Sequence, residues 1–293
     1  MKTRVFALFC ALSLSAVAQQ LDIQQATLGQ WMDFRPEAFY QMQWRDGERL
    51  SAWKDGILWE ASAKQGTDTL LTAENLAQIT GKEFKSVPFS HEWVEPNLLF
   101  IQQGLNVWLI NLEEASVVYA YDLPKEAENI EVHPASGRTA FTMGPNVWVA
   151  EKDGSLLGLT DEKKEGVSHG SGYVHRQEFG IQKGLWWSLD GQKLAWYVKD
   201  ESMVTDYPLV ATSSRIAAQK AVKYPMAGMK SEEVSIRIHD LKDGSQRALD
   251  VAGPKEQYLT AVTWGPKGKE MYVGVLNRGQ DSLSMQAYDA ESG

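Results

Sequence analysis

The side chain with the clearest potential for chemistry is the carboxylate of Glu178, in the segment Val174–Ile181 (VHRQEFGI). Polar residues precede it, and Phe179 and Gly180 follow it directly. This run of polar residues, an aromatic residue and a glycine is unusual immediately before an apolar strand. A carboxylate in such a setting could bind a cationic group of a ligand. Glu178 is therefore the first candidate binding residue.

A second candidate is Ser168, because Gly166-Val167-Ser168-His169-Gly170 matches the G-x-S-x-G pattern of hydrolase nucleophiles. That nucleophile needs a strand before the serine and a helix after it. Here residues 161–165 are charged, as in a loop, and the Gly-Ser-Gly run at 170–172 has no helical periodicity. We therefore expect a glycine-rich turn leading to Glu178, and not a catalytic serine.

Metal and cofactor chemistry has little support in the sequence. The five histidines form no HExxH or other closely spaced ligand pattern; they are His91, His133, His169, His175 and His239. The single cysteine, Cys10, lies in the N-terminal segment, and the sequence has no phosphate-binding glycine loop or dinucleotide fingerprint. We expect no metal and no cofactor.

The N-terminus has the pattern of a secretory signal peptide. Met1–Arg4 is basic, Val5–Val17 is apolar or small, and Ala16-Val17-Ala18 precedes Gln19. We expect residues 1–18 to be removed and the protein to be exported, to the periplasm or outside the cell. The apolar run is too short to span a membrane.

The net charge of −9 argues against nucleic acid or an anionic membrane as partner, because both need a basic patch.

Short strands separated by tight turns should position these residues. Asp-Gly pairs, a strong sign of hairpins beside alternating apolar residues, occur at 46–47, 55–56, 153–154, 190–191 and 243–244. A longer unit of strand, turn and strand occurs at 132–141, 187–196 and 264–273, with a looser copy at 43–53, and Phe89–Leu112 reads as another set of strands without the clear turn. Short strands in units of roughly 40 residues are typical of propeller blades. This repeat predicts an all-β fold, a β-propeller over residues 19–293, in preference to a two-sheet sandwich.

Two features depart from the repeat. Residues 200–229, with Tyr207-Pro208 and Tyr224-Pro225, lengthen the spacing and predict an arm or an elaborated blade edge. Only Leu21–Met32 and Thr72–Ile79 have a helical pattern, and both stretches are short.

The segment Gly172–Tyr197 resembles the substrate-anchoring segment of the dipeptidyl peptidase IV family, among the prolyl oligopeptidase-like serine peptidases. Further similar segments follow in the family's order: 184–188, 194–197, 200–204, 224–228 and 288–290. The resemblance is strong over about residues 172–293 and mainly repeat-like before residue 160. It implies that Glu178 holds the free amino terminus of a peptide substrate. The distance from such an anchor to the nucleophile would decide how many residues are removed, because each extended residue spans about 3.3–3.6 Å.

Two departures from the family pattern bear on specificity. Dipeptidyl peptidases typically have two adjacent glutamates here, whereas this chain has Gln177 and then Glu178. The surrounding pattern is more similar to bacterial prolyl tripeptidyl peptidases, so removal of dipeptides and of tripeptides both stay open. The family's arginine for the substrate carbonyl has no clear counterpart, and Gln102-Gln103 occupies the region where it is expected.

The chain ends at Gly293 in a strand that leads into a turn, and we expect it to be truncated before propeller closure. The resemblance implies a Ser–Asp–His triad in an α/β-hydrolase domain beyond residue 293, so this chain alone should be inactive. The complete enzyme would release Xaa-Pro dipeptides or Xaa-Xaa-Pro tripeptides, and family members often form homodimers. The alternative is a non-enzymatic periplasmic propeller that binds peptides or proteins.

Overall fold

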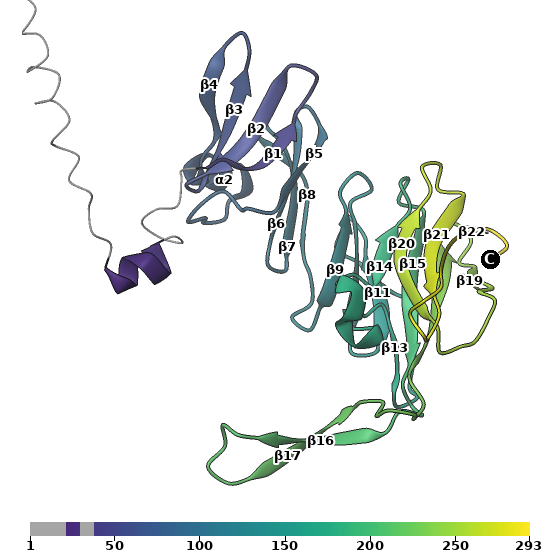
Figure 1. Ribbon diagram of the computed structural model, residues 1–293. Helices are drawn as coiled ribbons and strands as arrows, with labels where there is room; N and C mark the ends of the chain where they lie inside the picture. Colours follow the sequence, from purple (N-terminus) through teal and green to yellow (C-terminus); the bar gives the residue numbers. More distant parts are fainter. Residues whose placement is uncertain (1–21, 30–37) are drawn as a thin grey trace, which may run out of the picture.

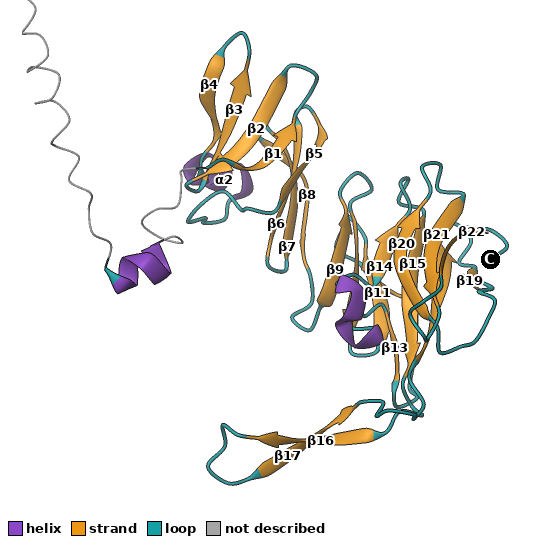
Figure 2. Cartoon of the chain, viewed as in Figure 1, coloured by secondary structure: helices purple, strands orange, loops and turns teal. Residues whose placement is uncertain are grey.

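The computed structural model describes residues 22–29 and 38–293. The expected signal peptide, residues 1–18, lies outside the described residues. Strands dominate the described chain and its helices are short (Figure 1, Figure 2). The prediction of an all-β fold is confirmed.

Three four-stranded antiparallel sheets come first, and in each of them strands that follow one another in the chain pair in the sheet. Sheet one contains β1 (Tyr40–Trp44), β2 (Arg49–Lys54), β3 (Ile57–Ser62) and β4 (Gly66–Leu71). Sheet two contains β5 (His91–Glu95), β6 (Leu98–Gln103), β7 (Asn106–Asn111) and β8 (Ser116–Asp122). Sheet three contains β9 (Glu128–His133), β10 (Arg138–Met143), β11 (Asn146–Ala150) and β12 (Leu156–Gly158).

Two further sheets complete the series. Sheet four contains β13 (Val167–His169), β14 (Leu185–Trp187), β15 (Lys193–Asp200), β18 (Glu233–Asp240) and β19 (Gln246–Ala248). Sheet five contains β20 (Tyr258–Trp264), β21 (Glu270–Leu276) and β22 (Leu283–Asp289). Among the described strands, no pairing joins sheet five to sheet one.

Apolar cores lie between consecutive sheets. Each of four buried clusters combines side chains of one sheet with those of the next. Representative pairs are Leu58 with Ile101, Phe100 with Phe141, Val149 with Trp196, and Ile236 with Val273. Sheets that pack on one another in chain order are the blades of a β-propeller. We therefore number the sheets as blades 1 to 5.

The Asp-Gly pairs all lie in connections between paired strands of a blade, where the sequence predicts them. At Asp55 and Gly56 both residues have positive φ, 52° and 82°, which matches the two-residue hairpin between β2 and β3. At Asp46 the side chain accepts hydrogen bonds from the amides of Glu48 and Arg49, which closes the turn before β2.

Blades 1 and 2 are also joined by a buried arginine. The guanidinium of Arg45 is paired with Glu60 of blade 1 (Nη1–Oε2, 2.6 Å) and donates to Asn97 of blade 2 (Nη2–Oδ1, 2.8 Å). It also lies over the ring of Trp93, 4.9 Å from the centroid. Because only 7% of the Arg45 side chain is exposed, these partners replace the water that a guanidinium normally needs.

Helices are confined to short segments. The helix expected over Thr72–Ile79 is confirmed as α2 (Ala73–Thr80), which begins at a capping box between Thr72 and Asn75 and ends at Gly81 with φ 69°. Of the other expected helix, residues 23–29 are helical and include the π-helical η1 (Gln25–Gly29). A third helix, η2 (His175–Gly180), has 3-10 geometry and was not predicted.

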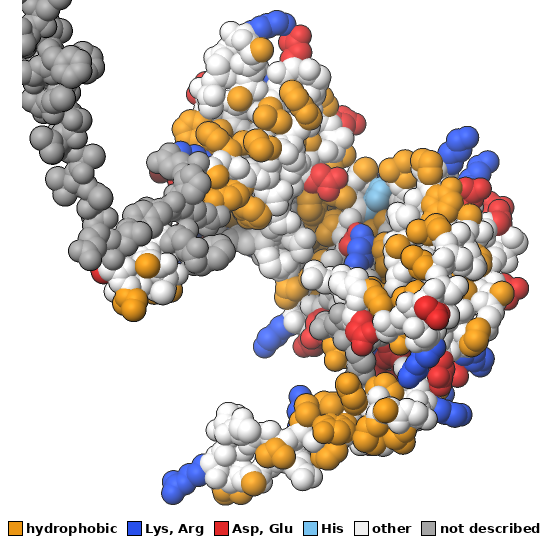
Figure 3. Space-filling model, viewed as in Figure 1, with side chains coloured by type: hydrophobic (Ala, Val, Ile, Leu, Met, Phe, Trp, Pro, Cys, Tyr) orange, Lys and Arg blue, Asp and Glu red, His pale blue; other side chains and the backbone are white. Residues whose placement is uncertain are grey.

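The segment 200–229 contains a two-stranded hairpin of β16 (Asp206–Ala211) and β17 (Ala218–Lys223). It projects away from the blades (Figure 1). Hydrophobic side chains gather along it on the face shown in Figure 3. Those with large exposed fractions include Tyr207, Leu209, Val210, Ile216 and Tyr224.

Candidate functional site

The first strand of blade 4 is interrupted, and the interruption contains Glu178. β13 and β14 both pair with β15: His169 lies opposite Val198, and Leu185 lies opposite Trp196. The ladder along β15 therefore resumes almost where it stopped, although 15 residues separate the two pieces. We call residues 170–184 the anchor loop.

Glycines allow the two ends of the anchor loop to meet. A Cβ on Gly184 would lie 2.3 Å from the carbonyl oxygen of Gly170, and one on Gly172 would lie 2.6 Å from that of Gln182. Both distances are far below contact distance, so only glycine fits this crossing. Tyr197 of β15 closes the base, accepting from the Gly170 amide (2.8 Å) and donating to the Gly184 carbonyl (3.1 Å).

The G-x-S-x-G match lies at the start of this arrangement and lacks the geometry of a nucleophile. Ser168 is the central residue of the three-residue strand β13, opposite Lys199 of β15. The anchor loop follows β13, and its first five residues contain no helix. A strained turn between strand and helix, which would expose a serine for attack, is therefore not formed at Ser168.

His175 fixes the anchor loop to blade 5. The residue is 4% exposed, and its ring lies between Tyr197 and Tyr258, at ring-centroid distances of 6.5 and 5.2 Å. Its Nε2 accepts from the amide of Leu259 in β20 (3.0 Å), so the neutral ring has its proton on Nδ1. Burial lowers the pKa of His175 to about 4. The His175 amide donates to the carboxylate of the buried Glu232.

Glu178 lies on η2 and is exposed. The next residue, Phe179, has φ 62° and packs its ring on Tyr258 of blade 5, with centroids 5.1 Å apart. The Glu178 carboxylate accepts a hydrogen bond from Gln280, whose Nε2 lies 3.5 Å from Oε2. A buried histidine and a packed aromatic ring thus hold a solvent-facing carboxylate in place.

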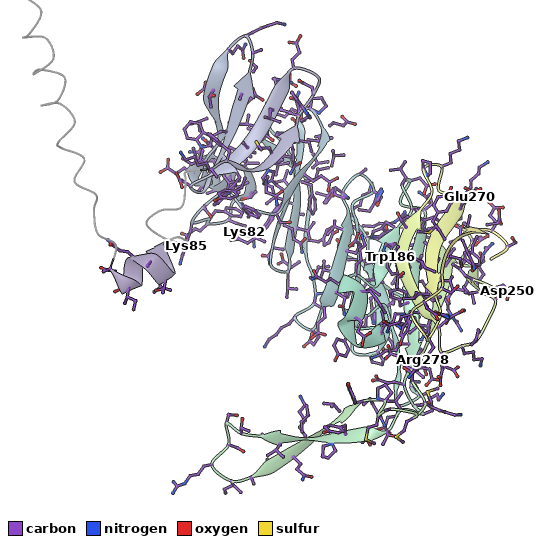
Figure 4. All side chains as sticks on the ribbon, in the orientation of Figure 1. Lys82, Lys85, Trp186, Asp250, Glu270 and Arg278 are labelled. Carbon is purple, nitrogen blue, oxygen red and sulfur yellow. The ribbon has the colours of Figure 1, made fainter. Side chains whose placement is uncertain are left out.

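Gln280 belongs to the turn between β21 and β22. Arg278, in the same turn, lies at the end of blade 5 opposite Glu270 (Figure 4). The helix η2 lies at this same end of the blades, from which the β16–β17 hairpin also projects (Figure 1). Glu178 therefore lies where blades 4 and 5 meet.

The end of the anchor loop is tied to blade 3. Lys183 pairs with Glu131 of β9, and the indole nitrogen of Trp187 donates to the Glu131 carbonyl (2.9 Å). Burial raises the pKa of the Glu131 carboxyl, and Lys183 opposes that shift. A cavity of about 100 Å³ lies beside this pair and is lined by residues 129–131 and 182–185. The loop is thus held by blades 3, 4 and 5 together.

The remaining sequence candidates contribute less. Gln102 and Gln103 end β6 in blade 2, and Gln102 donates to the Gly104 carbonyl. Within residues 22–29 and 38–293, no group of three or more His, Cys, Asp or Glu side chains could hold a metal ion. No helix in the described part of the chain is long and apolar enough to cross a membrane.

Several residues around Glu178 were not found from the sequence. Tyr258, Glu232 and Gln280 lie far from the anchor loop in the chain, and each is unremarkable in its local sequence. The nearest local pattern is the run Asn277–Ser282, whose Asn, Gly and Asp residues are typical of a turn. That pattern indicates the turn but not what the turn contacts.

Comparison with known proteins assigns the chain to a family. Residues 103–293 match the model of the dipeptidyl peptidase IV N-terminal region. A probable dipeptidyl-aminopeptidase B of Talaromyces marneffei is 27% identical over 177 residues, covering 54% of this chain and 20% of that protein. That of Pyrenophora tritici-repentis is 23% identical over 278 residues, covering 84% of this chain and 32% of that protein. The chain thus spans about a fifth to a third of these relatives.

Solved structures agree with the propeller fold. A crystal structure from Bacteroides ovatus, assigned as a dipeptidyl aminopeptidase IV, has a TM-score of 0.76 and 31% identity. The match covers 88% of this chain and 36% of that one. Porphyromonas gingivalis dipeptidyl peptidase 4 has a TM-score of 0.68 at 19% identity, over 93% of this chain and 41% of that one, which shows the fold alone. The chain belongs to the dipeptidyl peptidase IV family, a hydrolase family, and represents its N-terminal portion.

Proposed function

We propose that this chain is the substrate-anchoring and gating propeller portion of an exported serine exopeptidase. The enzyme would release Xaa-Pro dipeptides or Xaa-Xaa-Pro tripeptides from peptides with a free amino terminus. The observation that carries the proposal is the placement of Glu178, an exposed carboxylate on a loop held by three blades. The catalytic triad belongs to a hydrolase domain outside this chain.

The chemistry of the anchor is that of an ion pair. A peptide α-amine has a pKa near 8 and is largely cationic at neutral pH. A bound peptide would cover Glu178 from water, and the carboxylate would then form a charge-assisted hydrogen bond to the ammonium group. In the free protein Glu178 is exposed, so its charge is well solvated and costs little to maintain.

The ties between the anchor loop and its neighbouring blades support a fixed position for Glu178. Ties to Leu259 in blade 5 and Glu131 in blade 3 fix Glu178 relative to the propeller. If the catalytic serine is fixed relative to the propeller as well, the number of residues between them sets the length of the product. A loose carboxylate would accept peptides of several lengths.

The test uses the longer enzyme that contains this chain and compares Glu178→Gln with the wild type. We expect kcat/KM for a free-amine Xaa-Pro substrate to fall roughly 10- to 100-fold, the equivalent of one hydrogen bond to a charged group. Glu165→Gln, at an exposed residue before β13, is the matched control. Unchanged hydrolysis by Glu178→Gln would refute the anchor.

Product analysis and N-terminal sequencing test the remaining parts. Digestion of peptides with proline at the second or at the third position, followed by mass spectrometry, distinguishes release of dipeptides from release of tripeptides. For export, we expect the mature protein to begin at Gln19. A mature protein that still begins at Met1 would contradict the proposed signal peptide.

A further inference from the structure

Two exposed side chains from different blades meet at the proposed anchor. Glu178 comes from the anchor loop of blade 4, and Gln280 comes from the β21–β22 turn of blade 5. The Gln280 Nε2 donates to Glu178 Oε2 at 3.5 Å, across 102 residues of sequence. The side-chain amide of Gln280 therefore lies beside the Glu178 carboxylate, and both residues are exposed.

The turn holds Gln280 in an uncommon conformation. Its φ is 59°, a value that residues other than glycine rarely adopt. Asn277 organises the turn: its Oδ1 accepts from the amides of Asp281 and Ser282, both at 3.1 Å. The main-chain carbonyl of Asn277 accepts from the main-chain amide of Gln280 (3.0 Å). The turn thereby fixes the backbone from which the Gln280 side chain reaches Glu178.

An ammonium group has three N–H donors, so one carboxylate does not satisfy it alone. Glu178 Oε2 already accepts from Gln280, which leaves Oε1 as its less occupied oxygen. The carbonyl oxygen of the same Gln280 amide is a further acceptor, and no described group donates to it. The amide group thus has a donor for the carboxylate and an acceptor for a cation.

We propose that Gln280 is the second residue of the amine site. Its Nε2 orients the Glu178 carboxylate, and its Oε1 accepts a hydrogen bond from the substrate ammonium group. This inference rests on the proposed function, because it needs Glu178 to bind an amine. It adds a neutral acceptor from blade 5, so the amine would bridge the two blades.

The test is a double-mutant cycle in the longer enzyme, with Glu178→Gln, Gln280→Leu and the double variant. Each is assayed on a free-amine Xaa-Pro substrate and on the same substrate lacking the α-amino group. We expect Gln280→Leu to lower kcat/KM about tenfold on the free-amine substrate, mainly through KM, and to leave the des-amino substrate unaffected. In the Glu178→Gln background the further loss should be much smaller.

Gln65→Leu, at an exposed turn of blade 1, is the matched control, and melting temperatures confirm that each variant folds. No loss, an equal loss on both substrates, or the full tenfold loss in the Glu178→Gln background would each overturn the role of Gln280. If Glu178→Gln lowers free-amine hydrolysis and Gln280→Leu does not, only this inference fails. If Glu178→Gln has no effect, the proposed function fails first.

Discussion

Acid should destabilise this protein through His175, and a single variant can isolate the effect. The residue is 4% exposed, and burial lowers the pKa of its ring from 6.5 to about 4. At one pKa unit per 1.36 kcal/mol, the neutral ring is favoured in the folded protein by about 3 kcal/mol. Protonation would also cost the hydrogen bond from the Leu259 amide, because that bond needs the Nε2 lone pair.

The direction in which stability changes with pH follows from which state, folded or unfolded, binds the proton. Between pH 6.5 and pH 4 the unfolded chain holds a proton at His175 and the folded chain does not. The stabilisation is therefore complete above pH 6.5 and is lost as the pH falls toward 4. Below pH 4 both states are protonated and the loss levels off.

The assay is urea unfolding followed by tryptophan fluorescence at several pH values from 7 to 4, for the wild type and His175→Gln. We expect the wild type to lose about 3 kcal/mol more than the variant over this range. His91, His169 and His239 also have lowered pKa values, but they titrate in both proteins and cancel. His133→Gln, at a half-exposed ring, is the control.

A constant difference between the two stability curves would refute this reasoning. It would mean that the protonated ring is compensated in the folded state, most directly by Glu232. The Glu232 Oε1 lies 3.7 Å from the His175 Nδ1, and a small movement would turn that contact into an ion pair. A loss of stability with pH that is steeper than protonation of one group allows would indicate that the whole anchor loop detaches.

Three further predictions concern stability and local charge. Gly184→Ala should cost about 1–3 kcal/mol of unfolding free energy, measured by urea denaturation, because its Cβ would overlap the Gly170 carbonyl. Gly47→Ala is the control and should cost little, because nothing lies within 4 Å of the added Cβ. Arg45→Leu should cost about 2–3 kcal/mol in the same assay, because it leaves a largely buried carboxylate unpaired, and a loss under about 0.5 kcal/mol would contradict a buried pair. Lys183→Met should raise the pKa of Glu131 further, and an NMR titration with no upward shift would show that the pair is unimportant.

Much of the fold could be predicted because its information is local. Asp-Gly pairs specify hairpins through positive φ at two adjacent residues, as at Asp55 and Gly56. The strand–turn–strand repeat specifies blades because each blade needs the same alternation of buried and exposed positions. Strands β14 and β15 lie on either side of the turn at Asp190-Gly191, as the unit at 187–196 predicts.

The candidate site could be predicted only in part. The segment around Glu178 was identified from its residues and its resemblance to a family, but η2 was not, because six residues with positive φ at His175, Phe179 and Gly180 have no helical periodicity. The contacts with Tyr258 and Gln280 depend on how blade 5 packs on blade 4. Such pairings arise from tertiary packing, which no local pattern encodes.

The interrupted strand of blade 4 makes the anchor loop an exchangeable part. Both of its ends are fixed by the β15 ladder and by the crossing of Gly170 with Gly184. The buried Val174 and His175 belong to the packing of blades 4 and 5, whereas residues 178–180 are exposed. Changes confined to that exposed stretch would leave the register of the blade intact. Selection could thus change the position of a carboxylate relative to the blades without altering the propeller. Loop grafts between relatives would allow the same change in protein engineering.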